Sequence, residues 1–315
     1  MNSKRVILAG GSGFLGKLLL KYLTEQGYEV IVLTRHPNQS AGVVKEIHWD
    51  GRTLGPWAEH LDGTLAVINL AGRSVNCRYN EENRRAILDS RVLSTRVLGE
   101  TIQHCARPPV VWLNSSTATI YKHSLDRAMD ERGEIGATPE AKDAFSVQVA
   151  QEWERAFDAA PTSATRKIAL RTAMVLGTEP GGVLDVLRRL VLSGLGGNMG
   201  TGNQYVSWIH EEDFCLAIEW LISRQDFRGV VNLAAPNPIP NRELMEMLRK
   251  ACGKSFGLPA ARWMLEIGAF FMRTETELII KSRRVVPGRL LESGFEFRFP
   301  GLEQALADLL PKMKK

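Results

Sequence analysis

Short apolar runs alternate with longer amphipathic stretches through the first half of the chain. The short runs end at glycine or polar residues and are too brief for helices, so we expect each to be a strand. They lie at residues 5–9, 29–33, 44–49, 65–70, 110–113 and 166–170, of which 44–49 is the weakest. The stretches at 14–23, 80–104 and 142–159 are expected helices. Strands without a polar face, alternating with helices, predict a parallel sheet that helices cover on both sides.

The second half of the chain changes character after residue 180. Glycines cluster between residues 181 and 202 around one expected helix, and a helix at 214–223 and a strand at 230–234 follow. Prolines at 236, 238 and 240 then break the chain, and the remainder is mostly helical. We therefore expect residues 1–180 plus 205–235 to form a nucleotide-binding domain. Residues 181–204 plus 236–315 would form a smaller substrate domain or lid over the carboxyl edge of the sheet.

The composition is that of a globular protein and excludes several classes of function. Apolar residues make up 44% and charged residues 24% of the 315 residues, enough for one large domain or two coupled ones. No uncharged stretch of the length a bilayer requires, about 18 residues, is predominantly apolar, so no membrane-spanning helix is expected. The first residues do not resemble a signal peptide. The net charge of +5 is small and dispersed, so we expect no nucleic-acid partner.

Two local features, a basic cluster and the four cysteines, have simple interpretations. The basic cluster Lys281, Arg283, Arg284 and Arg289 is expected to be a solvated helix face or a contact for a substrate anion. The cysteines at positions 77, 105, 215 and 252 lack CxxC spacing and a set of zinc partners. They predict reduced thiols, a cytoplasmic location and no metal site.

A glycine-rich loop follows the first expected strand and opens the first expected helix. Its glycines at positions 10, 13 and 16 have distinct uses: a tight turn, access of a pyrophosphate to the backbone, and close packing of helix on strand. The amino end of the helix adds free N–H groups for phosphates. The loop therefore predicts a dinucleotide site, although a turn without a ligand is the alternative. The loop residues are Gly10, Gly11, Ser12, Gly13, Phe14, Leu15 and Gly16.

The end of the second expected strand indicates which dinucleotide is preferred. NAD-selective folds of this kind carry an acidic residue there for the ribose 2′-hydroxyl. This chain has Thr34 and Arg35, a hydroxyl and a guanidinium, which suit a 2′-phosphate. We therefore expect NADP(H), with a surface arginine in a loop as the alternative.

Motifs along nearly the whole chain resemble those of extended short-chain dehydrogenases/reductases, in particular the atypical epimerase-family (YfcH-like) subgroup. The matching motifs are GGSGFLG (10–16), VINLAG (67–72), ILDSRV (87–92), SSTATIY (115–121), ALRTAMVLG (169–177), GLGGNMGTGNQYVSWIH (194–210), NLAAPNP (232–238) and RVVPGRLLESGFEFRFP (284–300). The glycine loop is shared by the whole superfamily, whereas the segments after residue 194 are specific to the subgroup. The resemblance implies a Rossmann-type, doubly wound sheet of about seven strands and a small carboxyl-terminal substrate domain.

The resemblance also implies site residues. The segment Asn69-Leu70-Ala71-Gly72 would line the cofactor cleft, unless it is only a tight turn. Thr117 matches the serine or threonine that holds the reacting oxygen, with a locally satisfied strand-end hydroxyl as the alternative. Arg91, Ser115 and Arg171 complete the expected cofactor contacts. Asn203, Gln204 and His210 are expected at the substrate or lid, with Asn232 as a further candidate, although each could instead satisfy buried backbone.

The Tyr-x-x-x-Lys pair that carries the superfamily's redox chemistry is absent. Its expected place on the helix after the fifth strand holds Phe145 and Val149, neither of which can move a proton. Tyr121 is the candidate replacement, although a packing role is the alternative. Asp213 is expected to cap the helix that follows it.

These observations lead to two hypotheses. One is an NADP(H)-dependent oxidoreductase, or nucleotide-sugar-epimerase-like enzyme, with a non-standard proton donor and a small carbonyl or sugar-nucleotide substrate. The other is a non-catalytic NADP(H)-binding redox sensor or regulator. The expected helices 80–104 and 141–159 resemble those that pair in dimers of the superfamily, so a homodimer is a further prediction.

Overall fold

The computed structural model describes residues 4–38, 44–261, 263–264 and 275–313 of the chain. Its centre is a seven-stranded parallel sheet in the order β10-β6-β5-β4-β1-β2-β3. The strands are β1 (Arg5–Ala9), β2 (Glu29–Thr34), β3 (Lys45–His48), β4 (Ala66–Asn69), β5 (Val111–Thr117), β6 (Arg166–Thr172) and β10 (Gly229–Leu233). The predicted doubly wound fold is confirmed.

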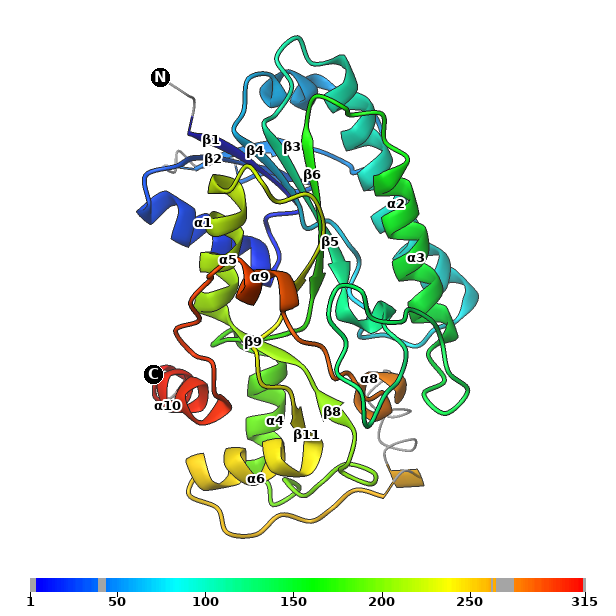
Figure 1. Cartoon of the computed structure of the whole chain (residues 1–315), viewed down its shortest axis with the longest axis vertical. Helices are drawn as coiled ribbons and strands as arrows, with labels where there is room; N and C mark the ends of the chain where they lie inside the picture. The colour runs from blue at the N-terminus through cyan, green and yellow to red at the C-terminus, as the bar shows by residue number, and fades with distance from the viewer. Residues whose placement is uncertain (1–3, 39–43, 262, 265–274, 314–315) are drawn as a thin grey trace.

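Alternate side chains of each strand enter different cores, which explains the unbroken apolar runs. Val6 and Leu8 of β1 belong to one core, and Ile7 belongs to the other. The first core lies under α1 (Phe14–Glu25), α5 (Glu211–Ser223) and α9 (Gly288–Glu292). The second lies under α2 (Glu81–His104) and α3 (Ala144–Asp158), which run side by side on the opposite face in Figure 1. Two short 3-10 helices are η1 (Pro56–Leu61) and η2 (Ala118–Ile120).

The sheet reverses its winding between β1 and β4. From β1 the chain moves outward through β2 and β3, whereas β4, β5, β6 and β10 build the other half. Ligands of open parallel sheets bind outside the carboxyl ends of the strands at such a reversal. Leu33 and Ala9 at these ends accept hydrogen bonds from the N–H groups of Gly10 and Leu70, at 3.0 Å and 2.8 Å, and so fix both crossover loops to the sheet.

A second, smaller cluster of elements has its own apolar core, which buries Trp208 and Met245. Its members are β7 (Met174–Leu176), α4 (Val183–Leu192), β8 (Tyr205–Val206), β9 (Trp208–His210), β11 (Ile239–Pro240), α6 (Asn241–Ala251) and α10 (Leu302–Lys312). The strands β8 and β9 pair with β11 and β7, not with the large sheet. The residue boundaries expected for the two domains stay a prediction.

The last described segments return to the large sheet. The chain passes through α8 (Glu277–Ile280), and the N–H of Val286 donates to the carbonyl of Met129 at 2.9 Å. The expected solvated face of the basic cluster is wrong for Lys281, whose side chain is fully buried in an ion pair with Asp143. Residues 275–285 therefore form a wall between the small cluster and the start of α3.

Candidate functional site

A cleft of about 1100 Å³, its open mouth included, lies at the reversal of the sheet. It begins at the glycine loop after β1, passes the loop after β4 and ends against β5 and α3. The predicted residues that line it are Gly10, Gly13, Phe14, Leu15, Gly16, Leu70, Ala71, Gly72, Arg91, Ser115 and Thr117. The sequence therefore located most of the lining of this cleft.

The glycine loop is shaped by two different constraints. Gly10 has a φ of +75°, and a Cβ there would lie 2.8 Å from the backbone of Ala71. A Cβ on Gly16 would lie 2.4 Å from the Cα of Gly11, so α1 packs too closely on the loop that precedes it for any side chain at this position. A Cβ on Gly13, by contrast, would have only the carbonyl of Gly10 within 4 Å, at 3.9 Å. Space is therefore kept at Gly13 on the cleft side.

The amino end of α1 faces this space without a side-chain cap. Gly13 occupies the N-cap position, and no side chain accepts from the first turn. The first N–H groups of a helix need acceptors, and a phosphate supplies them together with a favourable charge. Ser12 is exposed beside the turn, and Gly11 is buried beneath it.

The residues expected at the 2′-phosphate lie at the end of β2, beside the glycine loop. Thr34 is buried, and its hydroxyl accepts from the N–H of His36 at 3.4 Å. Arg35 is exposed. The N–H of Gly10 donates to the carbonyl of Leu33, so the glycine loop contacts β2 two residues before Arg35.

The loop after β4 is held by a buried amide network. Asn69 is fully buried; its amide donates to Asn114 at 2.7 Å, and its carbonyl accepts from the N–H of Ala71 at 3.0 Å. Asn69 therefore shapes the lining without forming part of it. Arg91, which does line the cleft, lies over the ring of Trp153 at 5.2 Å, and burial lowers its pKa to about 10.

The far end of the cleft combines hydroxyls with an apolar helix face. Thr117 accepts from the N–H of Thr119 at 3.1 Å, and both line the cleft. Phe145 and Val149 of α3 line it as well, as expected from their shared helix face. The positions of the superfamily's dyad thus present a phenyl ring and a branched aliphatic side chain.

The structure gives Tyr121 the packing role that was stated as its alternative, outside the lining of the cleft. Its side chain is 1% exposed, its hydroxyl donates to Asn232 at 2.8 Å, and it accepts from Arg171 at 3.0 Å. Burial raises the pKa of Tyr121, so the phenol keeps its proton. Arg171 forms a buried ion pair with Glu154, which also accepts from Ser116 at 2.6 Å. Through these contacts Tyr121 and Arg171 link β6 to β10 and α3, and both side chains lie outside the lining of the cleft.

The expected substrate residues also lie outside it. The side-chain oxygen of Asn203 accepts from the guanidinium of Arg242 at 2.7 Å. Gln204 is buried and donates to the carbonyl of Met199 at 2.8 Å. Gln204 thus satisfies buried backbone of the small cluster, which was the alternative stated for it, whereas Asn203 is exposed and contacts only a neighbouring side chain.

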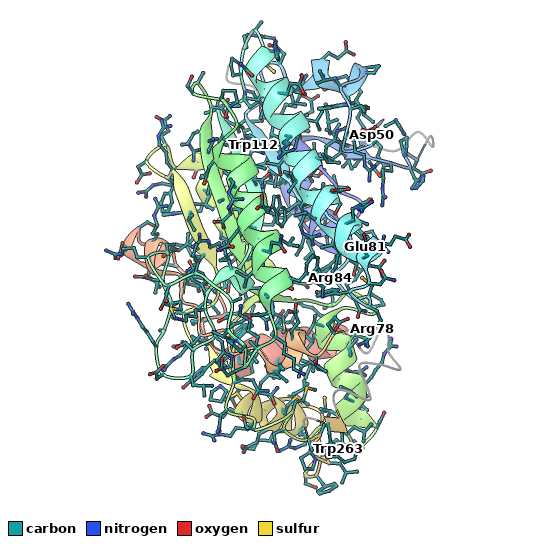
Figure 2. All side chains as sticks on the ribbon, turned by 90° about the vertical axis from the view of Figure 1, so that its right-hand side faces the viewer. Asp50, Arg78, Glu81, Arg84, Trp112 and Trp263 are labelled. Atoms are coloured by element: carbon teal, nitrogen blue, oxygen red, sulfur yellow. The ribbon has the colours of Figure 1, made fainter. Side chains whose placement is uncertain are left out.

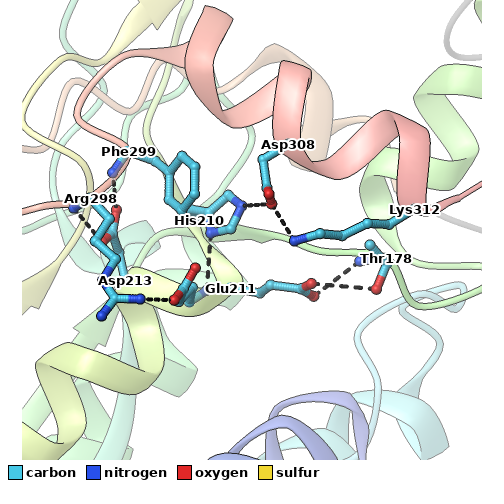
Figure 3. A network of polar contacts seen from close by, with 9 residues as sticks. Thr178, His210, Glu211, Asp213, Arg298, Phe299, Asp308 and Lys312 are labelled. Carbon is cyan, nitrogen blue, oxygen red and sulfur yellow. Dashed lines mark hydrogen bonds and ion pairs between the residues drawn. The ribbon is translucent and has the colours of Figure 1, made fainter.

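His210 and Asp213 organise the junction between α5 and α10, as Figure 3 shows. The Nδ1 of His210 accepts from the N–H of Glu212 at 3.1 Å, so His210, not Asp213, caps α5. Its Nε2 donates to Asp308 at 3.1 Å. Asp213 instead accepts from the N–H groups of Arg298 and Phe299, at 2.8 Å and 3.0 Å. The expected cap at Asp213 and lid role of His210 are corrected by these contacts.

Sequence reasoning missed three groups at the far end of the cleft. Tyr79 and Ser146 line it, and the carboxylate of Glu277 stands behind them. They come from the loop before α2, from α3 and from α8. Figure 2 shows the neighbouring Arg78 and Arg84 together at the amino end of α2. No spacing links these segments, so only the fold brings them together.

The described part of the chain also bears on the excluded functions. Within it, no three histidine, cysteine or acidic side chains are grouped as a metal ion would require. No helix among the described residues is long and apolar enough to cross a membrane. The four cysteines are all described, and none forms a disulfide.

The comparison with known families decides the classification. The model of the family described as "NAD dependent epimerase/dehydratase family" matches residues 6–234, more than half of the chain. The chain belongs to this family. A second model, described as a domain of unknown function (DUF1731), matches residues 260–309. The resemblance drawn from the motifs is thereby confirmed.

Relatives within the epimerase/dehydratase family match over nearly their whole length. The epimerase family protein SDR39U1 of Homo sapiens is 29% identical over 309 residues, which cover 97% of this chain and 99% of the relative. The epimerase family protein YfhF of Bacillus subtilis is 30% identical over 312 residues, with 98% and 99% covered.

Two solved structures agree with the fold. The crystal structure of human SDR39U1 (isoform2) with NADPH matches with a TM-score of 0.85 and 28% identity, covering 98% of this chain and 99% of that one. MoeE5 in complex with UDP-glucuronic acid and NAD matches with a TM-score of 0.77 and 21% identity, covering 98% and 99%, and shows the fold alone.

Proposed function

We propose that this member of the epimerase/dehydratase family binds NADP(H) in the cleft and uses it to reduce or oxidise a small molecule at a carbonyl or alcohol carbon. The observation that carries the proposal is the continuous cleft that runs from the uncapped amino end of α1 to the hydroxyls of β5. The human relative whose structure holds NADPH supports the choice of cofactor.

The residues present fit a dinucleotide. The space kept at Gly13 and the N–H groups of Phe14 and Leu15 would hold the pyrophosphate. Arg35 would pair with the 2′-phosphate, and Leu70 and Ala71 would line the cleft beside the adenosine half. When bound, the nicotinamide supplies or accepts a hydride.

The hydroxyl of Thr117 would orient the reacting oxygen. Its oxygen already accepts from the N–H of Thr119, so its proton is directed to another acceptor. A substrate carbonyl at the far end of the cleft could accept that proton as a hydrogen bond. Phe145 and Val149 keep this end apolar, which strengthens such a bond by excluding water.

The same two apolar side chains favour a second candidate, an NADP(H)-binding regulator without turnover. A protein that only senses the nicotinamide needs the glycine loop and Arg35 but no proton donor. A panel of carbonyl compounds separates the two candidates: steady oxidation of NADPH with any compound supports the enzyme, and tight binding without oxidation supports the regulator.

Binding itself is tested with Gly13→Val. The structure leaves room for a side chain at this position, so the variant should fold and unfold like the parent. Its branched side chain would occupy the phosphate space, so NADPH binding by calorimetry should be lost. Normal NADPH binding by Gly13→Val would contradict the assignment of the loop.

Two finer predictions accompany the proposal. The homodimer through α2 and α3 is tested by light scattering; the face of α2 left exposed carries charges such as Glu81, Arg85 and Arg96. The cytoplasmic location rests on the cysteines, none of which is in a disulfide.

A further inference from the structure

Beside Phe145, a different residue brings a phenol into the cleft. Tyr79 precedes α2, and its ring meets that of Phe145 edge to face with centroids 4.9 Å apart. Its backbone is held from two sides, because its N–H donates to Glu275 at 2.8 Å and its carbonyl accepts from Arg84 at 2.8 Å. The phenol that α3 lacks at position 145 is therefore present from another segment.

The hydroxyl of Ser146 lies next along α3 and also lines the cleft. It donates to Oε1 of Glu277, and the hydroxyl of Tyr79 donates to the same oxygen at 3.4 Å. Glu277 is 4% exposed and does not itself line the cleft. Two cleft hydroxyls thus share one buried carboxyl behind them.

The charges that face Glu277 come from two segments. Lys281 and Arg283 follow it on the carboxyl-terminal wall, and Asp143 stands at the start of α3. Lys281 forms an ion pair with Asp143, and the Nε of Arg283 donates to the hydroxyl of Thr119 at 3.1 Å. Burial raises the pKa of Glu277, although the Ser146 hydroxyl, Arg283 and Lys281 oppose the rise and Asp143 adds to it. Burial also raises the pKa of Tyr79, to about 12.

We infer that Glu277 and Ser146 replace the missing dyad: Glu277 stores a proton behind the cleft, and Ser146 passes it to the reacting oxygen. This inference rests on the proposed function, because the oxygen belongs to the substrate of that reaction. Ser146 is the residue that touches the substrate, and Glu277 is a positioning residue that acts through it. The phenol of Tyr79 lies beside Ser146, donates to the same carboxyl of Glu277 and stays protonated.

Ser146, Glu277 and water account for every proton in the proposed reaction. When Glu277 holds the proton, its carboxyl O–H donates to Oγ of Ser146, and the Ser146 hydroxyl turns from the carboxyl to the substrate. In the reducing direction the Oγ–H bond of Ser146 then breaks as the substrate O–H bond forms. The carboxyl O–H bond of Glu277 breaks as Ser146 regains its proton, and a carboxylate remains until water reprotonates it. The carbonyl carbon receives a hydride from a dihydronicotinamide, so the product is an alcohol. Oxidation runs through the same bonds in reverse.

The first experiment titrates glutamate carboxyls in the cofactor-free protein, using carbon-13 labelled glutamate and NMR. Burial raises the pKa of Glu131 and Glu211 as well as that of Glu277, so we expect several signals that titrate above the ordinary glutamate range. One of these raised signals should disappear in Glu277→Gln. In Ser146→Ala the same signal should titrate still higher, because the variant loses a hydrogen bond that favours the carboxylate. Glu152→Gln, which removes a half-buried carboxyl further along α3, should leave the signal in place. A Glu277 that titrates in the ordinary range would overturn the inference.

The second experiment follows reductase turnover against pH in the protein loaded with NADPH. Glu277→Gln should lower turnover by roughly 10²-fold or more and remove one limb of the pH profile, while NADPH affinity by calorimetry stays unchanged. An unchanged profile in Glu277→Gln would overturn the relay even when NADPH binds normally. Failure of the proposed function appears differently, as absent NADPH binding in the parent protein, and the carboxyl titration still decides whether Glu277 stores a proton.

Discussion

Arg35 is exposed at the end of β2, where the proposed site would place the 2′-phosphate of the cofactor. Losing a hydrogen bond to a charged group costs about 1.5–3 kcal/mol. Arg35→Ala should therefore weaken NADPH binding by about tenfold to a hundredfold and leave NADH binding almost unchanged, as measured by calorimetry. Arg52→Ala, which removes an exposed arginine after the neighbouring strand, is the control. Equal affinity of the parent for both cofactors would contradict the preference for NADP(H).

His210 should make the fold sensitive to acid. Burial lowers the pKa of His210 in the folded protein, despite the neighbouring Asp308. Between that lowered pKa and about 6.5, the unfolded chain binds more protons than the folded one, so the free energy of unfolding falls as the pH falls. Above about pH 6.5 this loss is absent.

His210→Asn removes that titration while keeping a side chain that can cap α5. Denaturant unfolding at several pH values between 7 and 5 should show a smaller loss of stability in this variant than in the parent. The exposed His104 offers the matched control, since His104→Asn should retain the parent's pH slope. Identical slopes for His210→Asn and the parent would refute the assignment.

Local sequence predicts residues whose role is set by their immediate neighbours. The glycine loop was found because a turn, a phosphate and a packed helix require glycines at fixed spacing, and Gly10 and Gly16 are confined as expected. Tyr79 and Glu277 were missed because their meaning arises only where the loop before α2 meets α8. The hydrogen-bond partner of Tyr121 could not be predicted for the same reason: Asn232 lies more than a hundred residues away along the chain.

The start of α3 is joined to the carboxyl-terminal wall by one buried ion pair. The side chains of Lys281 and Asp143 are both fully buried, and Lys281 also donates to the carbonyl of Thr119 at 2.5 Å. Lys281→Met would leave the carboxylate of Asp143 buried without its counter-charge. Such a loss typically costs about 3–5 kcal/mol, which denaturant unfolding should detect.

The double variant Lys281→Met with Asp143→Asn removes both charges and should recover much of that loss. The side-chain amide that this variant carries at position 143 could still accept from the N–H of Thr138, as Asp143 does at 2.8 Å. Additive effects of the two single substitutions would show that the pair is not coupled.

The sequence predicts helices and strands well where their apolar runs are long, and poorly where the paired strands have only two or three residues. The seven strands of the sheet were all expected, although β5 and β6 extend to Thr117 and Thr172, beyond their apolar runs. The pairs β7–β9 and β8–β11 were not expected, because strands of two or three residues carry no periodicity. Helix α5 starts at Glu211, three residues before its apolar stretch, since His210 caps it.

For the whole molecule, NADPH should act as a stabiliser. A ligand that binds only the folded state at a hundred times its dissociation constant raises the free energy of unfolding by about 2.7 kcal/mol. Thermal unfolding of the parent should therefore shift upward with NADPH. The same NADPH concentration should leave Gly13→Val unshifted, and a shift in that variant equal to the parent's would contradict the site.

The wall formed by residues 275–285 has a consequence for how the protein comes into being. During synthesis the glycine loop and the strands β1 to β5 leave the ribosome long before Glu277 and Lys281 do. Domains fold as their residues emerge, so the nucleotide half could take shape while one side of its cleft is still open. A nascent chain that met its cofactor early would hold it without the groups that direct a proton. The protein could therefore bind its cofactor before it could catalyse the proposed reaction. Catalysis would begin only once the carboxyl-terminal segment is in place.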